Sequence, residues 1–177
     1  MPLPRLSSRQ VSQLSAWVAI YIADQRSHFL ARAKPIGSDQ RIILRAFFPE
    51  DVLCAAKVAR GRASEPPFYS QLRAMGIRNA PPFSDMAGIT FEHVIVHVEP
   101  LETSLLFHEL VHAVQYKHLG LGRFAERYVR GFLTRGSYEE IPLEKQAYEL
   151  EEKFVRDPST KFSVEADVIE RIRRKQF

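Results

Sequence analysis

The stretch LLFHELVHAVQYKHLG, residues 105–120, places two histidines four positions apart in a run that is otherwise rich in apolar side chains. The residues around it are typical of helix ends. Pro100 suits the first position of a helix, and Glu102 suits its positive end. Basic side chains suit the negative end, and Gly120 can close the helix in a left-handed conformation. The sequence therefore predicts a helix from about Pro100 to Leu119.

On this helix, His108 and His112 share one face. Residues four apart in an α-helix are separated by about 40° around the axis and about 6 Å along it, so both imidazoles can converge on one ion. Imidazole nitrogens bind Zn²⁺ at about 2.0–2.1 Å. Glu109 lies one step round the helix, where it can reach a metal-bound water without binding the metal. The pattern H-E-x-x-H thus predicts two zinc ligands and Glu109 as a general base; the alternative is two ordinary histidines on an amphipathic helix.

The composition of the whole chain is that of a globular domain. Its 177 residues, 45% of them hydrophobic, are enough to bury a core and are close to the usual size of one domain, so we expect residues 1–177 to form a single domain. The single cysteine, Cys54, excludes an internal disulfide and a Cys-rich zinc site. No signal peptide and no run of about 20 apolar residues is recognisable. We therefore expect a cytoplasmic protein without a membrane partner.

The basic residues do not indicate a nucleic-acid partner. The formal net charge is only +4. Arg123, Arg127 and Arg130 recur at helical spacing, and the end of the chain is basic, but Glu126 and Glu170 interrupt the two groups. No nucleic-acid motif accompanies them, which favours a solvated face over a binding stripe.

The segment before the motif, about 1–85, is predicted to be a mainly helical scaffold. Ser7 to Gln10 fits a capping box, and apolar residues at helical spacing then predict a helix over about 9–33. Shorter helices are predicted near 42–48 and 68–75, whereas the segment 52–59 fits either a helical turn or a strand.

Two short strands are predicted directly before the motif helix. Ile89 to Phe91 and Val94 to Val98 are rich in β-branched and aromatic residues. The polar pair Glu92-His93 separates them, which is compatible with a hairpin.

A second helix is predicted to begin at Pro142, because proline suits the first helical position. Its apolar residues form one stripe, and Glu144 lies at the edge of that stripe, where its side chain can reach inward. The stripe consists of Leu143, Ala147, Leu150 and Phe154. A further, C-terminal helix is predicted over 156–177.

The motif H-E-L-V-H resembles that of the zincin metallopeptidases, in which it lies on a helix packed beside a small sheet. The segment Glu144-Lys145-Gln146-Ala147 is similar to the E-x-x-A of several gluzincin families, including integral-membrane CAAX-type peptidases and the soluble ImmA/IrrE-like group. The resemblance implies an α+β zincin-like core over 87–155, with additional N- and C-terminal helices, Zn²⁺ as cofactor and Glu144 as its third protein ligand. Tyr148 stands where those families often carry Asp or Asn, whose side chain helps to orient a ligand histidine. The residue with that role in this chain is therefore left open.

His118 is the competing third ligand, because it follows His112 by six residues, as in metzincins. Metzincins have a glycine between these histidines, where this chain has Gln115. If the helix continues, six residues rotate His118 by about 240° from His112 and turn it away from the metal. All three methionines precede the motif, so the methionine turn of metzincins is absent. We therefore expect Glu144 to be the ligand.

The resemblance implies hydrolysis of a peptide or protein substrate by zinc-activated water, with Glu109 taking the proton. By analogy, Val94 to Val98 is the candidate edge strand that holds the substrate in extended form. Tyr138, Tyr148 and His97 are candidate donors to the oxyanion. The alternative is a non-catalytic zincin-fold protein that binds a metal or a partner.

Overall fold

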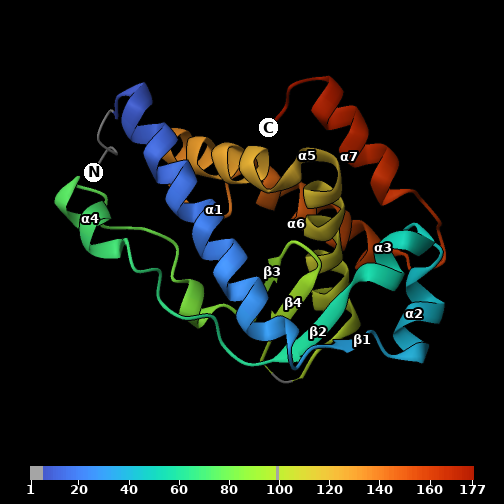
Figure 1. Cartoon of the computed structure of the whole chain (residues 1–177). Coiled ribbons are helices and arrows are strands. Elements are labelled where there is room, and N and C mark those ends of the chain that lie inside the picture. The colour runs from blue at the N-terminus through green and yellow to red at the C-terminus, as the bar shows by residue number, and fades with distance from the viewer. Residues whose placement is uncertain (1–5, 99) are drawn as a thin grey trace.

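The structure is a computed structural model that describes residues 6–98 and 100–177. In these residues the chain is α+β, with seven α-helices and one four-stranded mixed sheet (Figure 1). The predicted α+β class is therefore confirmed. The helices are α1 (Ser8–Leu30), α2 (Ser38–Leu44), α3 (Glu50–Ala55), α4 (Tyr69–Ala74), α5 (Thr103–Arg135), α6 (Pro142–Arg156) and α7 (Val164–Arg173).

The sheet has the order β1-β2-β4-β3, formed by β1 (Lys34–Pro35), β2 (Lys57–Arg60), β4 (Val94–His97) and β3 (Gly88–Phe91). β3 and β4 form the predicted antiparallel hairpin, while β2 runs parallel to β4 and antiparallel to β1.

The prediction that the segment Val94–Val98 is an edge strand is wrong. β4 lies between β2 and β3, and β3 is the edge strand on this side of the sheet. The reason is visible in the strand itself, because Val94, Ile95 and Val96 are all fully buried. Such a continuous apolar run is typical of a strand covered on both faces, as parallel neighbours usually are.

The N-terminal segment is less helical than predicted, since it supplies two strands of the sheet. The segment 52–59, for which helix and strand were both open, contains the end of α3 and then β2. Ala56 makes the change with an extended backbone, φ −62° and ψ 134°. The predicted capping box is confirmed, because the Ser7 side chain accepts from the amide of Gln10 and Gln10 Oε1 accepts from the amide of Ser7.

The motif helix α5 begins at Thr103 rather than Pro100, and its helical backbone is interrupted at Gly120. Gly120 has φ 71° and ψ 160°, a conformation that only glycine adopts readily, so the predicted break is confirmed. The ψ angle differs from that of the predicted left-handed helical cap. The chain then turns and resumes as a second helical half, which runs in a different direction (Figure 1).

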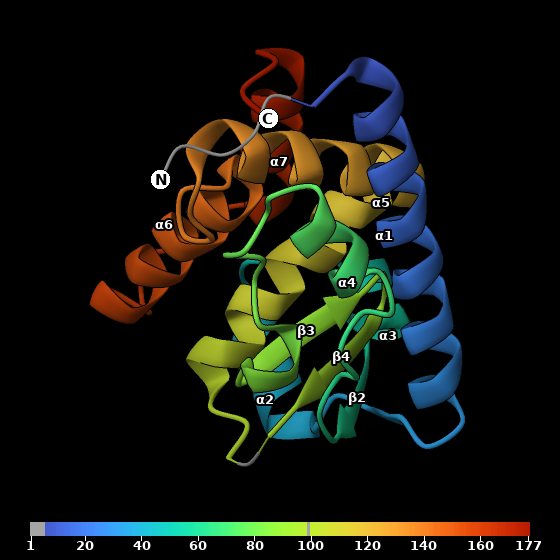
Figure 2. The ribbon, with the colours of Figure 1, turned by 90° about the vertical axis from the view of Figure 1, so that its left-hand side faces the viewer.

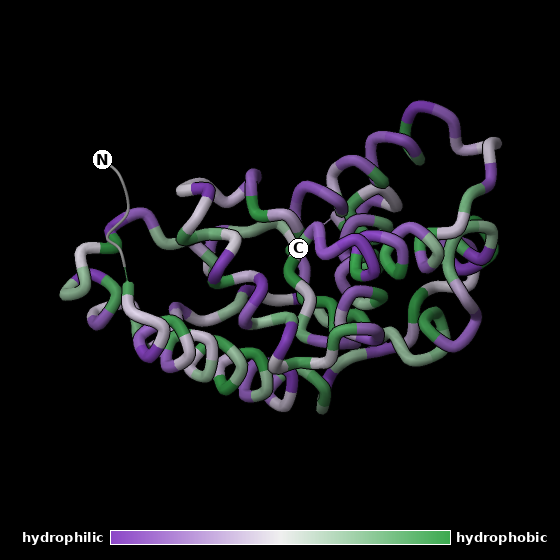
Figure 3. Tube along the Cα trace, turned by 90° about the horizontal axis from the view of Figure 1, so that it is seen from above, coloured by the Kyte–Doolittle hydropathy of each residue, from purple (hydrophilic) through white to green (hydrophobic). Residues whose placement is uncertain are grey.

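The sheet is packed between helices, and α1 and α5 both contact its strands (Figures 1 and 2). Hydrophobic and hydrophilic residues alternate along α1 (Figure 3). Tyr21 and Phe29 of α1 pack against Phe91 of β3. α6 packs along α5, and its predicted stripe is buried. Between these two helices, Phe107 of α5 stacks on Phe154 of α6 at 4.6 Å between ring centroids.

The C-terminal segment predicted as helix over 156–177 is shorter in the structure. α6 continues to Arg156, and α7 begins only at Val164, where the Ser163 side chain accepts from the amide of Ala166. Among the described helices, none is both long enough and apolar enough to cross a membrane.

Candidate metal centre

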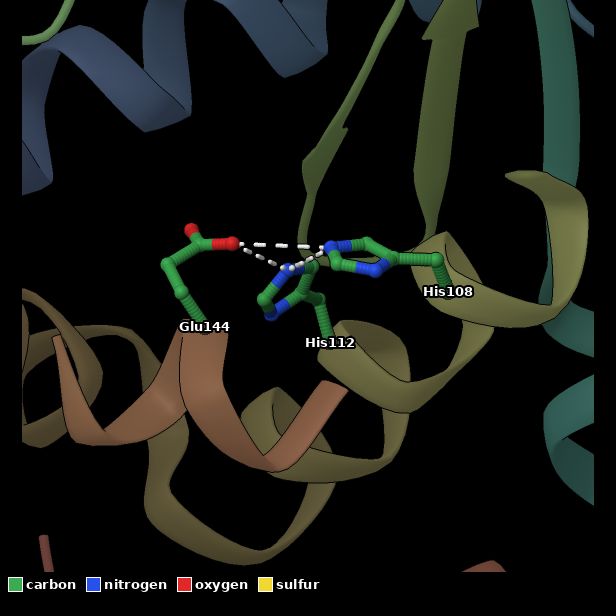
Figure 4. Close-up of side chains that lie close together, drawn as sticks. All are labelled: His108, His112 and Glu144. Carbon is green, nitrogen blue, oxygen red and sulfur yellow. Dashed lines mark hydrogen bonds and ion pairs between the residues drawn. The ribbon is translucent and has the colours of Figure 1, made fainter. Parts of the chain in front are cut away.

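The three predicted metal ligands lie together in the structure. His108 and His112 project from α5, and Glu144 projects toward them from the first turn of α6 (Figure 4). All three are buried, with exposed fractions of 5%, 5% and 3%. The facing atoms are Nε2 of both histidines and Oε2 of Glu144.

The spacing of these three atoms matches one tetrahedral ion. The two Nε2 atoms lie 3.2 Å apart, and Oε2 of Glu144 lies 3.5 Å from Nε2 of His108 and 3.2 Å from Nε2 of His112. Ligands bound at about 2.0–2.1 Å in tetrahedral geometry are about 3.3–3.4 Å from one another. The residues therefore fit a small tetrahedral cation such as Zn²⁺.

The far side of each imidazole contacts an oxygen acceptor. Nδ1 of His108 lies 3.0 Å from Oε2 of Glu151, and Nδ1 of His112 lies 2.9 Å from Oε1 of Gln115. Because both partner atoms accept, each Nδ1 carries a hydrogen, and in the neutral ring each Nε2 is left with a free lone pair. This is the arrangement that orients metal-binding histidines in proteins.

Without a cation, three acceptors would face one another. Oε2 of Glu144 is buried and has no hydrogen-bond partner among the described residues. Burial lowers the pKa of His108, but the carboxylates of Glu144 and Glu151 outweigh burial and raise it to about 10. Burial raises the pKa of Glu144, but the two histidines outweigh it and hold that pKa well below its usual range. The site therefore attracts positive charge, either a proton or a metal ion.

Glu109 lies beside this cluster without belonging to it. Its side chain is buried, and the hydroxyl of Thr90 in β3 donates to its Oε2 at 2.6 Å. Burial raises the pKa of Glu109, while the two histidines and the Thr90 hydrogen bond act in the opposite direction. The edge strand also fits closely here, because a Cβ added to Gly88 would lie 2.7 Å from Oε1 of Glu109.

A small pocket of about 40 Å³ opens beside Glu109, His112 and Glu144. Its other walls are largely aromatic and come from α1, the segment 83–86, β3, both halves of α5 and the segment before α6. They include Tyr21, Phe83, Phe91, Tyr116, Phe124, Tyr128 and Tyr138.

The three candidate oxyanion donors differ in position. Tyr138 lines the pocket together with Glu109 and Glu144. Tyr148 packs against the ring of His108 at 4.6 Å between centroids and is 42% exposed. His97 lies at the end of β4, where its Nδ1 contacts the carbonyl of the next residue, and it does not line the pocket.

His118 lies away from the cluster, as the continuous helix predicts. α5 keeps helical geometry from His112 to His118, and the break comes only at Gly120. Nε2 of His118 contacts Oε1 of Glu165 in α7 at 2.8 Å.

Four residues next to the site were not identified from the sequence. Gln115 follows His112 by three residues and Glu151 follows Glu144 by seven, so helical spacing alone could have drawn attention to both. No local signal points to Thr90 or Tyr128, because strand pairing and the bend at Gly120 bring them to the site.

Comparison with known proteins does not place the chain in a family. No protein-family model, no curated protein and no solved structure matches it. The resemblance to zincins stays a prediction from the motif.

Proposed function

We propose that the protein is a zinc-dependent peptidase in which His108, His112 and Glu144 hold the ion and Glu109 is the general base. One observation carries the proposal. Three buried acceptor atoms lie 3.2–3.5 Å apart, and a fourth buried group, a carboxylate held by Thr90, lies beside them.

The ligand set supports a catalytic site more than a structural one. Two histidines and one glutamate leave one tetrahedral position open, whereas structural zinc sites usually use four protein ligands. A bound zinc ion would supply Lewis acidity, which polarises a carbonyl and lowers the pKa of water. Two histidines and one carboxylate also suit Fe²⁺. Glu109 favours hydrolysis, because a base beside the ligands serves the activation of water.

Glu109 is suited to move a proton. Thr90 occupies Oε2, and Oε1 forms no hydrogen bond with the described residues, so Oε1 can accept a proton from water. Burial raises its pKa, which brings the carboxylate closer to the range of an efficient general base. Glu109 would then return the proton to the leaving amine nitrogen.

Tyr138 is the strongest of the three candidate donors to the carbonyl oxygen. Burial, and then the carboxylate of Glu144, raise the pKa of Tyr138 well above its usual value, so the phenol keeps its proton. A neutral phenol can donate a hydrogen bond to developing negative charge. Burial, and then Glu144, also raise the pKa of Tyr128, which lines the same pocket.

The edge strand that would hold an extended substrate is β3 rather than β4. β3 is the strand that contributes Thr90 and Gly88 beside Glu109, and it lies at the edge of the sheet. A peptide paired with this edge would pass the general base.

Elemental analysis combined with a peptide-library cleavage assay tests the proposal. The purified protein should contain about one zinc per chain and cleave library peptides, and Glu109→Gln should keep the zinc but lose cleavage, because an amide cannot take the proton. Iron in place of zinc, or cleavage that survives in Glu109→Gln, would overturn the mechanism. Stoichiometric zinc without turnover would support the non-catalytic alternative. The nearly complete burial of the ligands is the observation that favours this alternative, because it leaves little room for a substrate.

A further inference from the structure

A chain of hydrogen bonds connects α7 with His112, and it begins at the partly exposed Asp167. Nε2 of Gln146 donates to Oδ1 of Asp167 at 2.6 Å, and Nε2 of Gln115 donates to Oε1 of Gln146 at 3.0 Å. Oε1 of Gln115 then accepts from Nδ1 of His112 at 2.9 Å. Both glutamine side chains are completely buried, and the chain joins three helices.

The direction of this chain is set at its outer end. Arg171 donates to the same Oδ1 of Asp167 at 3.1 Å, so this oxygen must act as an acceptor. Gln146 therefore presents its NH₂ group to Asp167 and its oxygen to Gln115. Gln115 in turn presents NH₂ to Gln146 and its oxygen to His112, which needs a hydrogen on Nδ1.

A second acceptor fixes Gln115 in the same orientation. Its Nε2 also donates to the carbonyl of Leu143 at 2.9 Å. If either buried amide turned over, two NH₂ groups or two oxygens would face each other, and their hydrogen bonds would be lost without water to replace them. The network is therefore consistent with one orientation of both amides.

We infer that Gln146 and Asp167 are positioning residues for His112: through Gln115 they hold the ring with hydrogen on Nδ1, so that Nε2 faces the metal position. This inference rests on the proposed zinc site. It gives α7 a function beyond packing, because the acceptor that orients the chain lies on that helix. His108 obtains the same orientation from a single carboxylate, Glu151.

Zinc affinity measured by chelator competition tests the inference. Gln115→Leu should weaken zinc binding by about 10- to 100-fold, the usual effect of removing the direct partner of a ligand histidine. Gln146→Leu and Asp167→Leu should weaken it by roughly 2- to 12-fold, the effect of one hydrogen bond. Asp167→Asn keeps an acceptor oxygen and should bind like the wild type. Glu149→Gln is the matched control, because Glu149 pairs with Arg171 but not with the glutamines.

A second measurement separates positioning from a general loss of stability. In the metal-free protein, nuclear magnetic resonance should detect a slowly exchanging hydrogen on Nδ1 of His112 and protected NH₂ groups on both glutamines. Asp167→Leu should accelerate exchange at these groups, and Asp167→Asn should restore protection. The readout needs no metal, so it decides the inference even if the wild type binds no zinc and the proposed function fails.

Two results would overturn the inference. The first is unchanged zinc affinity together with unchanged hydrogen exchange in Gln146→Leu and Asp167→Leu. The second is a loss of zinc affinity in both Asp167→Leu and Asp167→Asn that parallels a lower free energy of unfolding. Asparagine would then fail to rescue binding, and Asp167 would contribute to packing alone.

Discussion

Gly88→Ala should displace the general base while leaving the metal ligands in place. The new Cβ would lie 2.7 Å from Oε1 and 3.2 Å from Cδ of Glu109, and 3.0 Å from Cδ1 of Leu105. Ordinary contacts begin at about 3.5 Å, so the carboxylate must move by about 0.8 Å. This movement would also strain the 2.6 Å hydrogen bond from Thr90.

A displacement of this size is large for catalysis. A shift of about 1 Å in a reacting group can reduce the rate by about 100-fold, so we expect kcat/KM to fall by roughly 30- to 100-fold in Gly88→Ala. Zinc content should stay at the wild-type value, because the three atoms nearest to the added Cβ belong to Glu109 and Leu105 and none belongs to a metal ligand.

The assay compares peptide cleavage and zinc content in Gly88→Ala and Gly122→Ala. A Cβ at Gly122 meets nothing within 4 Å, so this helical substitution introduces the same methyl group without steric conflict. Cleavage at the wild-type rate in Gly88→Ala would refute the argument that the fit of β3 against Glu109 positions the base. Loss of zinc in Gly88→Ala would refute the argument that the substitution displaces Glu109 without disturbing the metal ligands.

Three further outcomes are expected. The hydrogen bond from Thr90 lowers the pKa of Glu109, so Thr90→Val should raise that pKa. Because the base acts in its ionised form, the acidic limb of the pH–rate profile should move to higher pH. In dialysis, Glu144→Ala should release zinc while His118→Ala retains it; the reverse result would restore the metzincin-like arrangement. Gly120→Ala should lower the free energy of unfolding in urea by about 1–3 kcal/mol, because alanine is strained at the positive φ of this position. Steric conflict does not contribute, since a Cβ there meets nothing within 4 Å.

The local elements were predictable because their signals lie in neighbouring residues. The capping box at Ser7, the hairpin before the motif and the helix beginning at Pro142 all depend on interactions within a few positions of the chain. The convergence of His108 and His112 follows from helical geometry in the same way. Gly120 was correctly predicted to interrupt the helix, although its ψ of 160° could not be predicted.

The sheet order was not predictable, because the decisive pairing is between distant segments. β2 pairs with β4 although residues 61–93 separate the two strands along the chain. This parallel pairing places β4 inside the sheet and leaves β3 at the edge. The predicted edge strand was wrong for this reason. A buried apolar run such as Val94 to Val96 is the available signal, but it does not identify the partner strand.

By itself, the sequence determined two histidines on one helical face, a glutamate beside them, and a second helix that could present Glu144. Tertiary structure alone decided that Glu144 meets the histidines, that Thr90 holds Glu109, and that Gln115 and Glu151 orient the two rings. The physical reason is the distance along the chain over which each interaction acts. Helical periodicity acts over three or four residues, whereas the distances within the site depend on how α6, α7 and the sheet pack against α5.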